Sequence, residues 1–283
     1  MNNNIQKLLL AALGSMLVLS GCDSSQGESS TADETSSSAA KWYDQMLSNS
    51  VREDLSVIME DGITEAVKIE NSVGNIEVSA SPDDTLSVKA SLQTSNNHRY
   101  KTMMEEIVKE AGISVRVEGD QMVVVAHPQG DPETDLWTWA ERKFGDSKFG
   151  INYEVQLPAK VTHFDISTDV GEIGLSGLDG EYNVFNSVGV IRINEANLKG
   201  KSSVQSELGN LRIQLDGIES GSALKATTDV GTITAKLPPD ASYSLRITTD
   251  LGRVSGASKG KSDVNGGGPL ITLTSSVGSI TVE

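Results

Sequence analysis

The stretch NSVGVI, residues 186–191, decides the fold of this 283-residue chain because it is one of seven variants of a single glycine-centred phrase. The copies read NSVGNI at 71–76, STDVGEI at 167–173, NSVGVI at 186–191, SELGNL at 206–211, TTDVGTI at 227–233, TTDLGRV at 248–254 and SSVGSI at 275–280. From Gly171 onward the central glycines are 18, 20, 22, 21 and 26 residues apart. A period of about 20 residues is typical of a repeat array, in which each copy forms one structural unit.

Alignment of the copies on the central glycine reveals columns of like residues, which we number relative to that glycine. Positions −5, −1 and +2 are apolar in all seven copies, and position +4 is apolar in six. Positions −5, −3 and −1 are every second residue, as expected for side chains on one inward face of a strand. Positions +2 and +4 are also two apart, but they are out of step with the first set by one residue and would face the opposite side of a straight strand. The chain must therefore bend at the glycine, through a positive φ or a bulge. The predicted corner glycines are Gly74, Gly171, Gly189, Gly209, Gly231, Gly252 and Gly278.

Each copy is expected to form a strand, a corner glycine and a second strand; we call this a unit and name it by its glycine. A repeat of about 20 residues at about 3.3 Å per residue makes one turn of a coil about 65 Å around. We therefore predict an all-β fold, a right-handed parallel β-helix (β-solenoid) in which each strand pairs with the same strand of the next unit. The alternative is an antiparallel β-sandwich, whereas propeller blades need about twice this period.

Position −3 carries small polar residues on the predicted inward face: Asn71, Thr168, Asn186, Ser206, Thr228, Thr249 and Ser275. A buried polar side chain destabilises the fold unless it is hydrogen-bonded. The side chains at position −3 either form hydrogen bonds, along their column or to the backbone of the corner, or face water beside the corner.

Position −2 is acidic in three copies that follow one another in sequence, at Glu207, Asp229 and Asp250. Stacked carboxylates are the hard ligands that calcium prefers, so these residues are weak candidates for a metal site. The alternative is a solvated stripe, and we expect neither a metal nor a cofactor.

The 96 residues between Gly74 and Gly171 lack the phrase. Strands are expected at 55–59, 86–92, 113–117, 122–126 and 151–157, with a hairpin turn at 118–121. Helices are expected at 98–111 and 132–144, within a helical insertion at about 97–145, the second capped by Asp131 with Pro132 as its first residue. Trp137 and Trp139 lie on the apolar face of the second helix, which either docks a partner or covers the end of the repeat array.

The N-terminus indicates export and anchoring. The apolar run at 8–19 has 12 residues, too few to span a membrane, and is typical of a signal peptide. LSGC at 19–22 resembles the lipobox of bacterial lipoproteins and ends on Cys22, the single cysteine. We predict a signal peptide at 1–21, a lipidated Cys22 with a Ser-rich tether at 22–40, an N-terminal β region at 41–160 and the repeat region at 161–283. An ordinary secretory signal without lipid is the alternative.

The stretch VQLPAKVTHFDISTDVGEIGLSGLDGEYNVFNSVGVIRI, residues 155–193, resembles the bacterial "putative adhesin" β-repeat family. The resemblance covers about residues 55–283. It implies a β-solenoid in an extracytoplasmic setting, and it transfers no catalytic residues, because the family has no established ones.

The composition narrows the functional classes. A formal charge of −16 argues against nucleic acid and anionic membrane surfaces as partners. His98, His127 and His163 are scattered, and no catalytic motif stands out. We expect a lipid-anchored cell-envelope binding or scaffold protein that is not an enzyme, with an envelope protein or glycan as its partner. The alternatives are a regulatory component of an envelope-stress system, acting through a membrane partner, and a polysaccharide-active β-helix enzyme.

The last copy of the phrase raises a question of association. It runs to Glu283, and the only nearby segment that could cover it, residues 255–269, is rich in Gly, Ser and Lys. We expect the Gly278 unit to be an open edge that pairs with a second copy or with a partner's strand.

Overall fold

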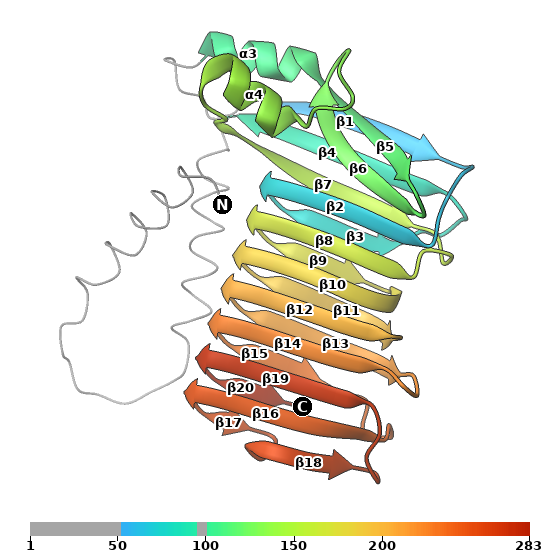
Figure 1. Cartoon of the computed structure of the whole chain (residues 1–283), viewed down its shortest axis with the longest axis vertical. Coiled ribbons are helices and arrows are strands. Elements are labelled where there is room, and N and C mark those ends of the chain that lie inside the picture. Colours follow the sequence, from blue (N-terminus) through green and yellow to red (C-terminus); the bar gives the residue numbers. More distant parts are fainter. Residues whose placement is uncertain (1–51, 95–100) are drawn as a thin grey trace, which may run out of the picture. The chain divides into compact units, whose positions relative to one another are not determined.

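Each copy of the repeated phrase forms two strands that meet at the central glycine. The computed structural model describes residues 52–94 and 101–283, and these form a mixed sheet of 20 strands and two short helices. In Figure 1 the sheet has a front layer, with the strand before each corner glycine, and a back layer, with the strand after it. The predicted all-β class is confirmed, and two facing layers are also compatible with a β-sandwich.

The layers contain the strands in the following order of pairing. The front layer consists of β5 (Ala111–Glu118), β6 (Gln121–Pro128), β2 (Ala66–Val73), β8 (His163–Val170), β10 (Asp179–Val188), β12 (Lys201–Leu208), β14 (Ala223–Val230), β19 (Leu270–Val277), β16 (Tyr243–Leu251) and β18 (Gly260–Val264). The back layer consists of β1 (Arg52–Met59), β4 (Leu86–Thr94), β7 (Phe149–Leu157), β3 (Ile76–Ala80), β9 (Ile173–Ser176), β11 (Ile191–Leu198), β13 (Leu211–Ile218), β15 (Ile233–Lys236), β20 (Ile280–Val282) and β17 (Val254–Ser255).

Strands of neighbouring units pair in parallel and place equivalent positions side by side. Val184 of β10, for example, lies between Ile166 of β8 and Val204 of β12, all at position −5. Among the described strands, antiparallel pairing is confined to β1–β4, β4–β7, β5–β6 and β16–β18. The hairpin predicted at 118–121 is confirmed as the turn between β5 and β6.

The spatial order of the units differs from their order in sequence. The Gly74 unit lies between β6 and β7 on one side and the Gly171 unit on the other. The Gly278 unit lies between the Gly231 unit and the Gly252 unit, so β19 and β20 are paired along both edges. The prediction that the Gly278 unit is an open edge is therefore wrong.

The polar segment at 255–269 is the reason for this insertion. Instead of remaining irregular, it forms β18, which pairs antiparallel with β16 and ends the front layer. The chain then returns past Pro269 into the space between β14 and β16, where β19 completes the sheet. A segment rich in Gly, Ser and Lys can cover the edge of the sheet, because an outermost strand needs backbone pairing rather than an apolar face.

The core lies between the layers and is built from positions −5 and +2. Side chains at position −5 are at most 1% exposed in all seven units, and they belong to one hydrophobic cluster with Ile76, Ile173, Ile191, Leu211, Ile233 and Ile280 of position +2. Position +4 completes this core except at Gly256, which is exposed, and Val282, which is partly buried.

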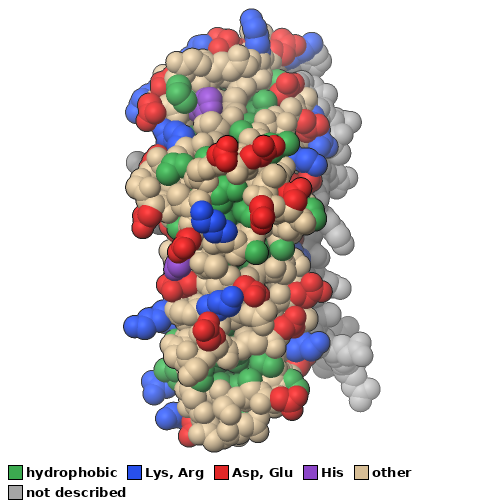
Figure 2. Space-filling view, turned by 90° about the vertical axis from the view of Figure 1, so that its right-hand side faces the viewer, with side chains coloured by type: hydrophobic (Ala, Val, Ile, Leu, Met, Phe, Trp, Pro, Cys, Tyr) green, Lys and Arg blue, Asp and Glu red, His purple; other side chains and the backbone are tan. Residues whose placement is uncertain are grey.

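Position −1 departs from the predicted inward face. Leu251, Val230 and Val277 at this position are 69%, 45% and 44% exposed, because the chain has already begun to turn toward the back layer. The opposite edge of the layers, where Glu65 precedes β2, carries dispersed acidic and basic side chains (Figure 2).

The polar column at position −3 is buried and holds the corners together. All seven side chains are at most 6% exposed. Five of them donate a hydrogen bond of 2.7–3.3 Å to the carbonyl oxygen of the corner glycine in the adjacent unit: Thr168 to Gly74, Asn186 to Gly171, Thr228 to Gly209, Thr249 to Gly278 and Ser275 to Gly231. Asn71 donates to the backbone carbonyl oxygen of Ile151 instead, whereas the hydroxyl of Ser206 has no hydrogen-bond partner among the described residues. Of the predicted alternatives for position −3, bonding to the corner backbone is confirmed.

The corner glycines are required chiefly by a close approach between units. A Cβ atom added to Gly209 would lie 1.6 Å from the carbonyl oxygen of Gly189, and each of the other corner glycines has a backbone oxygen within 2.1 Å of that position. Five of the seven also have φ between +127° and +153°. Gly209 and Gly252 lie outside the left-handed region, so of the two expected means of bending the chain a positive φ is not used there, and the close approach alone excludes a side chain.

Two helices lie at one end of the layers (Figure 1). These are α3 (Lys101–Glu110), which buries Met104 and Ile107, and α4 (Leu136–Phe144), which buries Leu136 and Ala140. The predicted start of α4 at Pro132 is wrong, since Asp135 caps it by accepting a 2.9 Å hydrogen bond from the Thr138 N–H. Neither helix in the described part of the chain has the length and apolar character needed to cross a membrane.

We predict that the position −3 hydrogen bonds stabilise the stacked units. Ser275→Ala removes the hydrogen-bond donor to the partly buried Gly231 carbonyl and should lower the free energy of unfolding by about 1 kcal/mol. Ser206→Ala is the matched control, because its buried hydroxyl has no partner to lose. Urea unfolding of both variants checks this, and equal losses would contradict it.

The inserted Gly278 unit leads to a second prediction. Deletion of residues 270–283 removes an interior strand pair, so β14 and β16 lose their shared neighbour. Amide hydrogen exchange should then become fast in β14 and throughout β16–β18, while β8–β12 stay protected. Protection that persists in β16 would mean that the Gly252 unit can stack directly on the Gly231 unit.

Candidate functional site

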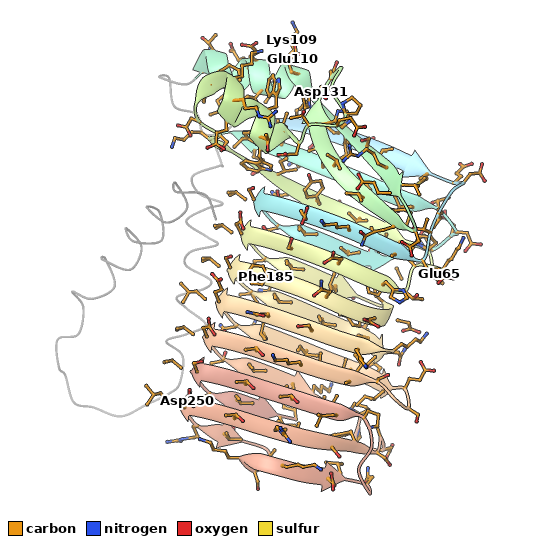
Figure 3. The ribbon with its side chains drawn as sticks, in the orientation of Figure 1. Glu65, Lys109, Glu110, Asp131, Phe185 and Asp250 are labelled. Carbon is orange, nitrogen blue, oxygen red and sulfur yellow. The ribbon has the colours of Figure 1, made fainter. Side chains whose placement is uncertain are left out.

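The acidic residues selected from the sequence do not form one group. Glu207 lies on β12 and Asp229 on the neighbouring β14, but β19 places Ser276 between Asp229 and Asp250. Asp250 projects at the edge of the layers where β16 ends (Figure 3). Within residues 52–94 and 101–283, no group of three or more His, Cys, Asp or Glu side chains is placed to hold a metal ion. The interruption by Ser276 favours the solvated stripe.

The tryptophans of α4 pack against the end of the core. Trp137 stacks on Phe149 of β7 with ring centroids 4.0 Å apart and planes inclined by 14°. Trp139 packs edge to face on Phe144 with ring centroids 5.7 Å apart, and the Lys143 ammonium lies 4.8 Å from the centre of the Trp139 ring. Both indoles are partly buried against the hydrophobic cluster, which favours a covering role for this helix. The predicted lipidation site, Cys22, lies outside the described residues.

The most distinctive polar arrangement is a row across the outer face of the back layer at position +3. Glu77, Gly174, Arg192 and Arg212 pair in register, since positions +2 and +4 face the core and position +3 must face outward. On the other side of Glu77 the row continues through Glu154 to Lys89. We call these residues the charged row.

A shallow depression of about 200 Å³ lies over the acidic half of the charged row. Its lining comes from β3, β4, β7 and β9: Glu77, Val78, Ser79, Ser87, Lys89, Glu154, Val155, Gln156 and Ser176. Carboxylates, an ammonium, hydroxyls and an amide thus converge on one surface, which suits hydrogen bonding to a polar ligand.

Gly174 allows the Glu77 side chain to cross the neighbouring strand. A Cβ atom at Gly174 would lie 1.9 Å from Oε2 of Glu77, so the carboxylate occupies the space that a side chain would fill. Glu77 as a whole is exposed, but local desolvation of its carboxylate over Gly174 raises the pKa of Glu77, with Glu172 and Glu154 acting in the same direction and Arg192 opposing them. Arg192 forms a salt bridge with Glu172. Along the row, the acidic Glu154 and Glu77 lie on one side of Gly174 and the basic Arg192 and Arg212 on the other, with Lys89 beyond Glu154.

The charged row was not recognised in the sequence. The row could have been found by comparing position +3, three residues after each corner glycine, across the seven copies. The residues at this position are Glu77, Gly174, Arg192, Arg212, Thr234, Ser255 and Thr281. A search for apolar alternation passes over these positions, because only the pairing of strands places the charged ones beside one another.

Comparison with known proteins gives only distant likenesses. No family model and no curated protein matches the sequence. Among solved structures, the chain is similar to a "putative cell adhesion protein" from Clostridium sporogenes, with 14% identity, a TM-score of 0.45 and coverage of 82% of this chain and 99% of that chain. A "putative adhesin" from Bacteroides fragilis has 17% identity, a TM-score of 0.41 and coverage of 82% and 97%. A "putative lipid binding protein" from Parabacteroides distasonis has 13% identity, a TM-score of 0.26 and the same coverage. These likenesses are too distant to assign a family or a function.

The raised pKa of Glu77 predicts a pH-dependent gain from its replacement. Since the folded pKa lies above the unfolded one, ionised Glu77 disfavours the folded state, and this effect fades as the pH falls through the folded pKa. Glu77→Gln should therefore raise the melting temperature at pH 7 and have less effect at lower pH. Glu60→Gln, at an exposed position outside the row, is the control. A difference from wild type that does not vary with pH would contradict the prediction.

The separation of Asp229 from Asp250 predicts that calcium does not stabilise the protein. Millimolar calcium should leave the melting temperature unchanged, since ligand binding to the folded state alone would raise it. A rise of several degrees that Asp229→Asn abolishes would show that carboxylates at position −2 do bind the ion.

Proposed function

We propose that this chain is an extracytoplasmic protein, anchored by a lipid at Cys22, that binds or scaffolds at the bacterial cell envelope in the manner of an adhesin, without catalysis. In this proposal the units form a parallel β-solenoid. The parallel, in-register pairing of equivalent positions supports the solenoid, and the LSGC ending on the single cysteine supports the anchor.

The observation that carries the binding role is the charged row. In-register strands repeat outward side chains at about 4.8 Å, so the row offers charges at regular intervals along the stack. The depression of about 200 Å³ over it is smaller than a typical pocket for a drug-sized ligand. A long polar polymer that touches several strands fits this surface better than a small molecule. We therefore propose a charged envelope glycan as the ligand of the row.

Binding of the full chain to charged polysaccharides and to isolated peptidoglycan tests this proposal. The double variant Glu77→Gln and Glu154→Gln should weaken binding about tenfold. The matched control is Glu53→Gln with Glu60→Gln, which removes two exposed carboxylates elsewhere. Because Glu77→Gln is expected to stabilise the fold, weaker binding cannot be attributed to unfolding. Equal affinity of both variants, or binding to none of these polymers, would overturn the proposal.

The anchor is tested separately. Cys22→Ser should abolish labelling by a fatty-acid analogue and move the protein from the membrane fraction to the soluble fraction, because two acyl chains hold a protein far more firmly than one. Unchanged membrane retention of the variant would contradict the lipid anchor. It would not bear on the proposal that the charged row binds a glycan.

A further inference from the structure

A continuous apolar stripe runs along the edge of the layers where the corner glycines lie. It consists of position −1 in stacking order: Val73, Val170, Val188, Leu208, Val230, Val277 and Leu251. We call it the corner stripe. Every unit has an aliphatic residue here outside the core, partly buried in the first four units of the stack and 44–69% exposed in the last three. Single exposed aliphatic residues are ordinary, but a continuous row of them marks an interaction surface.

The backbone along the corner stripe is already hydrogen-bonded. The N–H of six of the seven corner glycines, all except Gly252 in the outermost unit, donates to the position −1 carbonyl of the next unit, as from Gly209 to Val230 at 2.9 Å and from Gly278 to Leu251 at 2.8 Å. A partner strand would find no free backbone groups at these positions. Recognition must therefore use side chains, and an α-helix, whose backbone is satisfied internally, is the element suited to that.

The front-layer flank of the corner stripe is negatively charged. Position −2 holds Asp169, Glu207, Asp229 and Asp250 beside three serines, and no basic residue. None of these four carboxylates forms a salt bridge with another described residue. A partner with cations beside its apolar side chains is complementary to this flank, whereas a second copy, at a formal charge of −16, repels it.

We propose that the corner stripe docks a basic amphipathic α-helix of another protein, with its apolar seam on the stripe and its Lys and Arg residues against the position −2 carboxylates. Seven units at about 4.8 Å extend over about 29 Å, which is the length of a helix of about 19 residues. One helical turn rises about 5.4 Å, so each turn meets about one unit. The corner stripe shares no residue with the charged row, and the two surfaces can fail independently.

The apolar contact is tested with a synthetic helix of 19 residues that has a leucine seam and lysines on one flank. Its affinity for the full chain is measured by fluorescence anisotropy. Val230→Ser with Leu251→Ser should weaken binding about tenfold. Ile58→Ser with Val117→Ser is the matched control, because these residues are 66% and 47% exposed on strands away from the stripe, against 45% and 69% for the test pair. Equal losses in the two variants would overturn the proposal.

The charge complementarity is tested in the same assay. Asp229→Asn with Asp250→Asn should weaken binding and reduce its salt dependence, whereas Asp61→Asn with Asp84→Asn, at exposed turns elsewhere, should not. A peptide with glutamates in place of its lysines should bind far more weakly, and equal binding would overturn the proposal. Sedimentation of the full chain tests whether a second copy occupies the corner stripe instead of a helix. A dimer that dissociates in the Val230→Ser, Leu251→Ser variant would assign the stripe to a second copy and overturn the proposal.

Discussion

The stack depends on the close approach of each corner glycine to the backbone carbonyl of the corner in the adjacent unit. At Gly209 the space for a Cβ atom is taken by the carbonyl oxygen of Gly189, and the same oxygen-to-glycine contact recurs through the stack. The small polar side chains at position −3 complete the corner by donating hydrogen bonds to the same carbonyls. Together these contacts explain why the phrase combines a small polar residue with a glycine three places later.

The spacing between units has consequences for the surface of the protein. Units that stack at one short distance place equivalent residues side by side, so a single residue type repeated in the sequence becomes a continuous row. The charged row on the back layer and the corner stripe beside the glycines both arise in this way. The two rows differ in chemistry, and we assign a polar polymer to the first and a basic helix to the second.

Much of this arrangement could be predicted from the sequence, because it follows from local periodicity. The corner glycines, the buried position −5 and the polar position −3 are all found where the alternation places them. The order of the units could not be predicted, since similar units offer similar edges and the loop that leads to Gly278 decides its neighbours. The start of α4 was missed because Asp131 with Pro132 and Asp135 are both plausible caps, and only the hydrogen bond to Thr138 distinguishes them. The charged row was missed because pairing between Glu77 and Glu154, which lie far apart in the chain, creates it.

The free energy of unfolding of Gly209→Ala tests the central claim most directly. Gly221→Ala is the control, because Gly221 has φ of +85° but, apart from its chain neighbours, no described residue within 4 Å of an added Cβ, whereas Gly209 has a backbone oxygen at 1.6 Å. We predict that Gly209→Ala lowers the free energy of unfolding by about 4 kcal/mol, since neighbouring units must move apart. Gly221→Ala should lower it by about 1 kcal/mol through backbone strain alone. A loss for Gly209→Ala no greater than that of Gly221→Ala would contradict the claim that the close approach of corner glycines sets the stack.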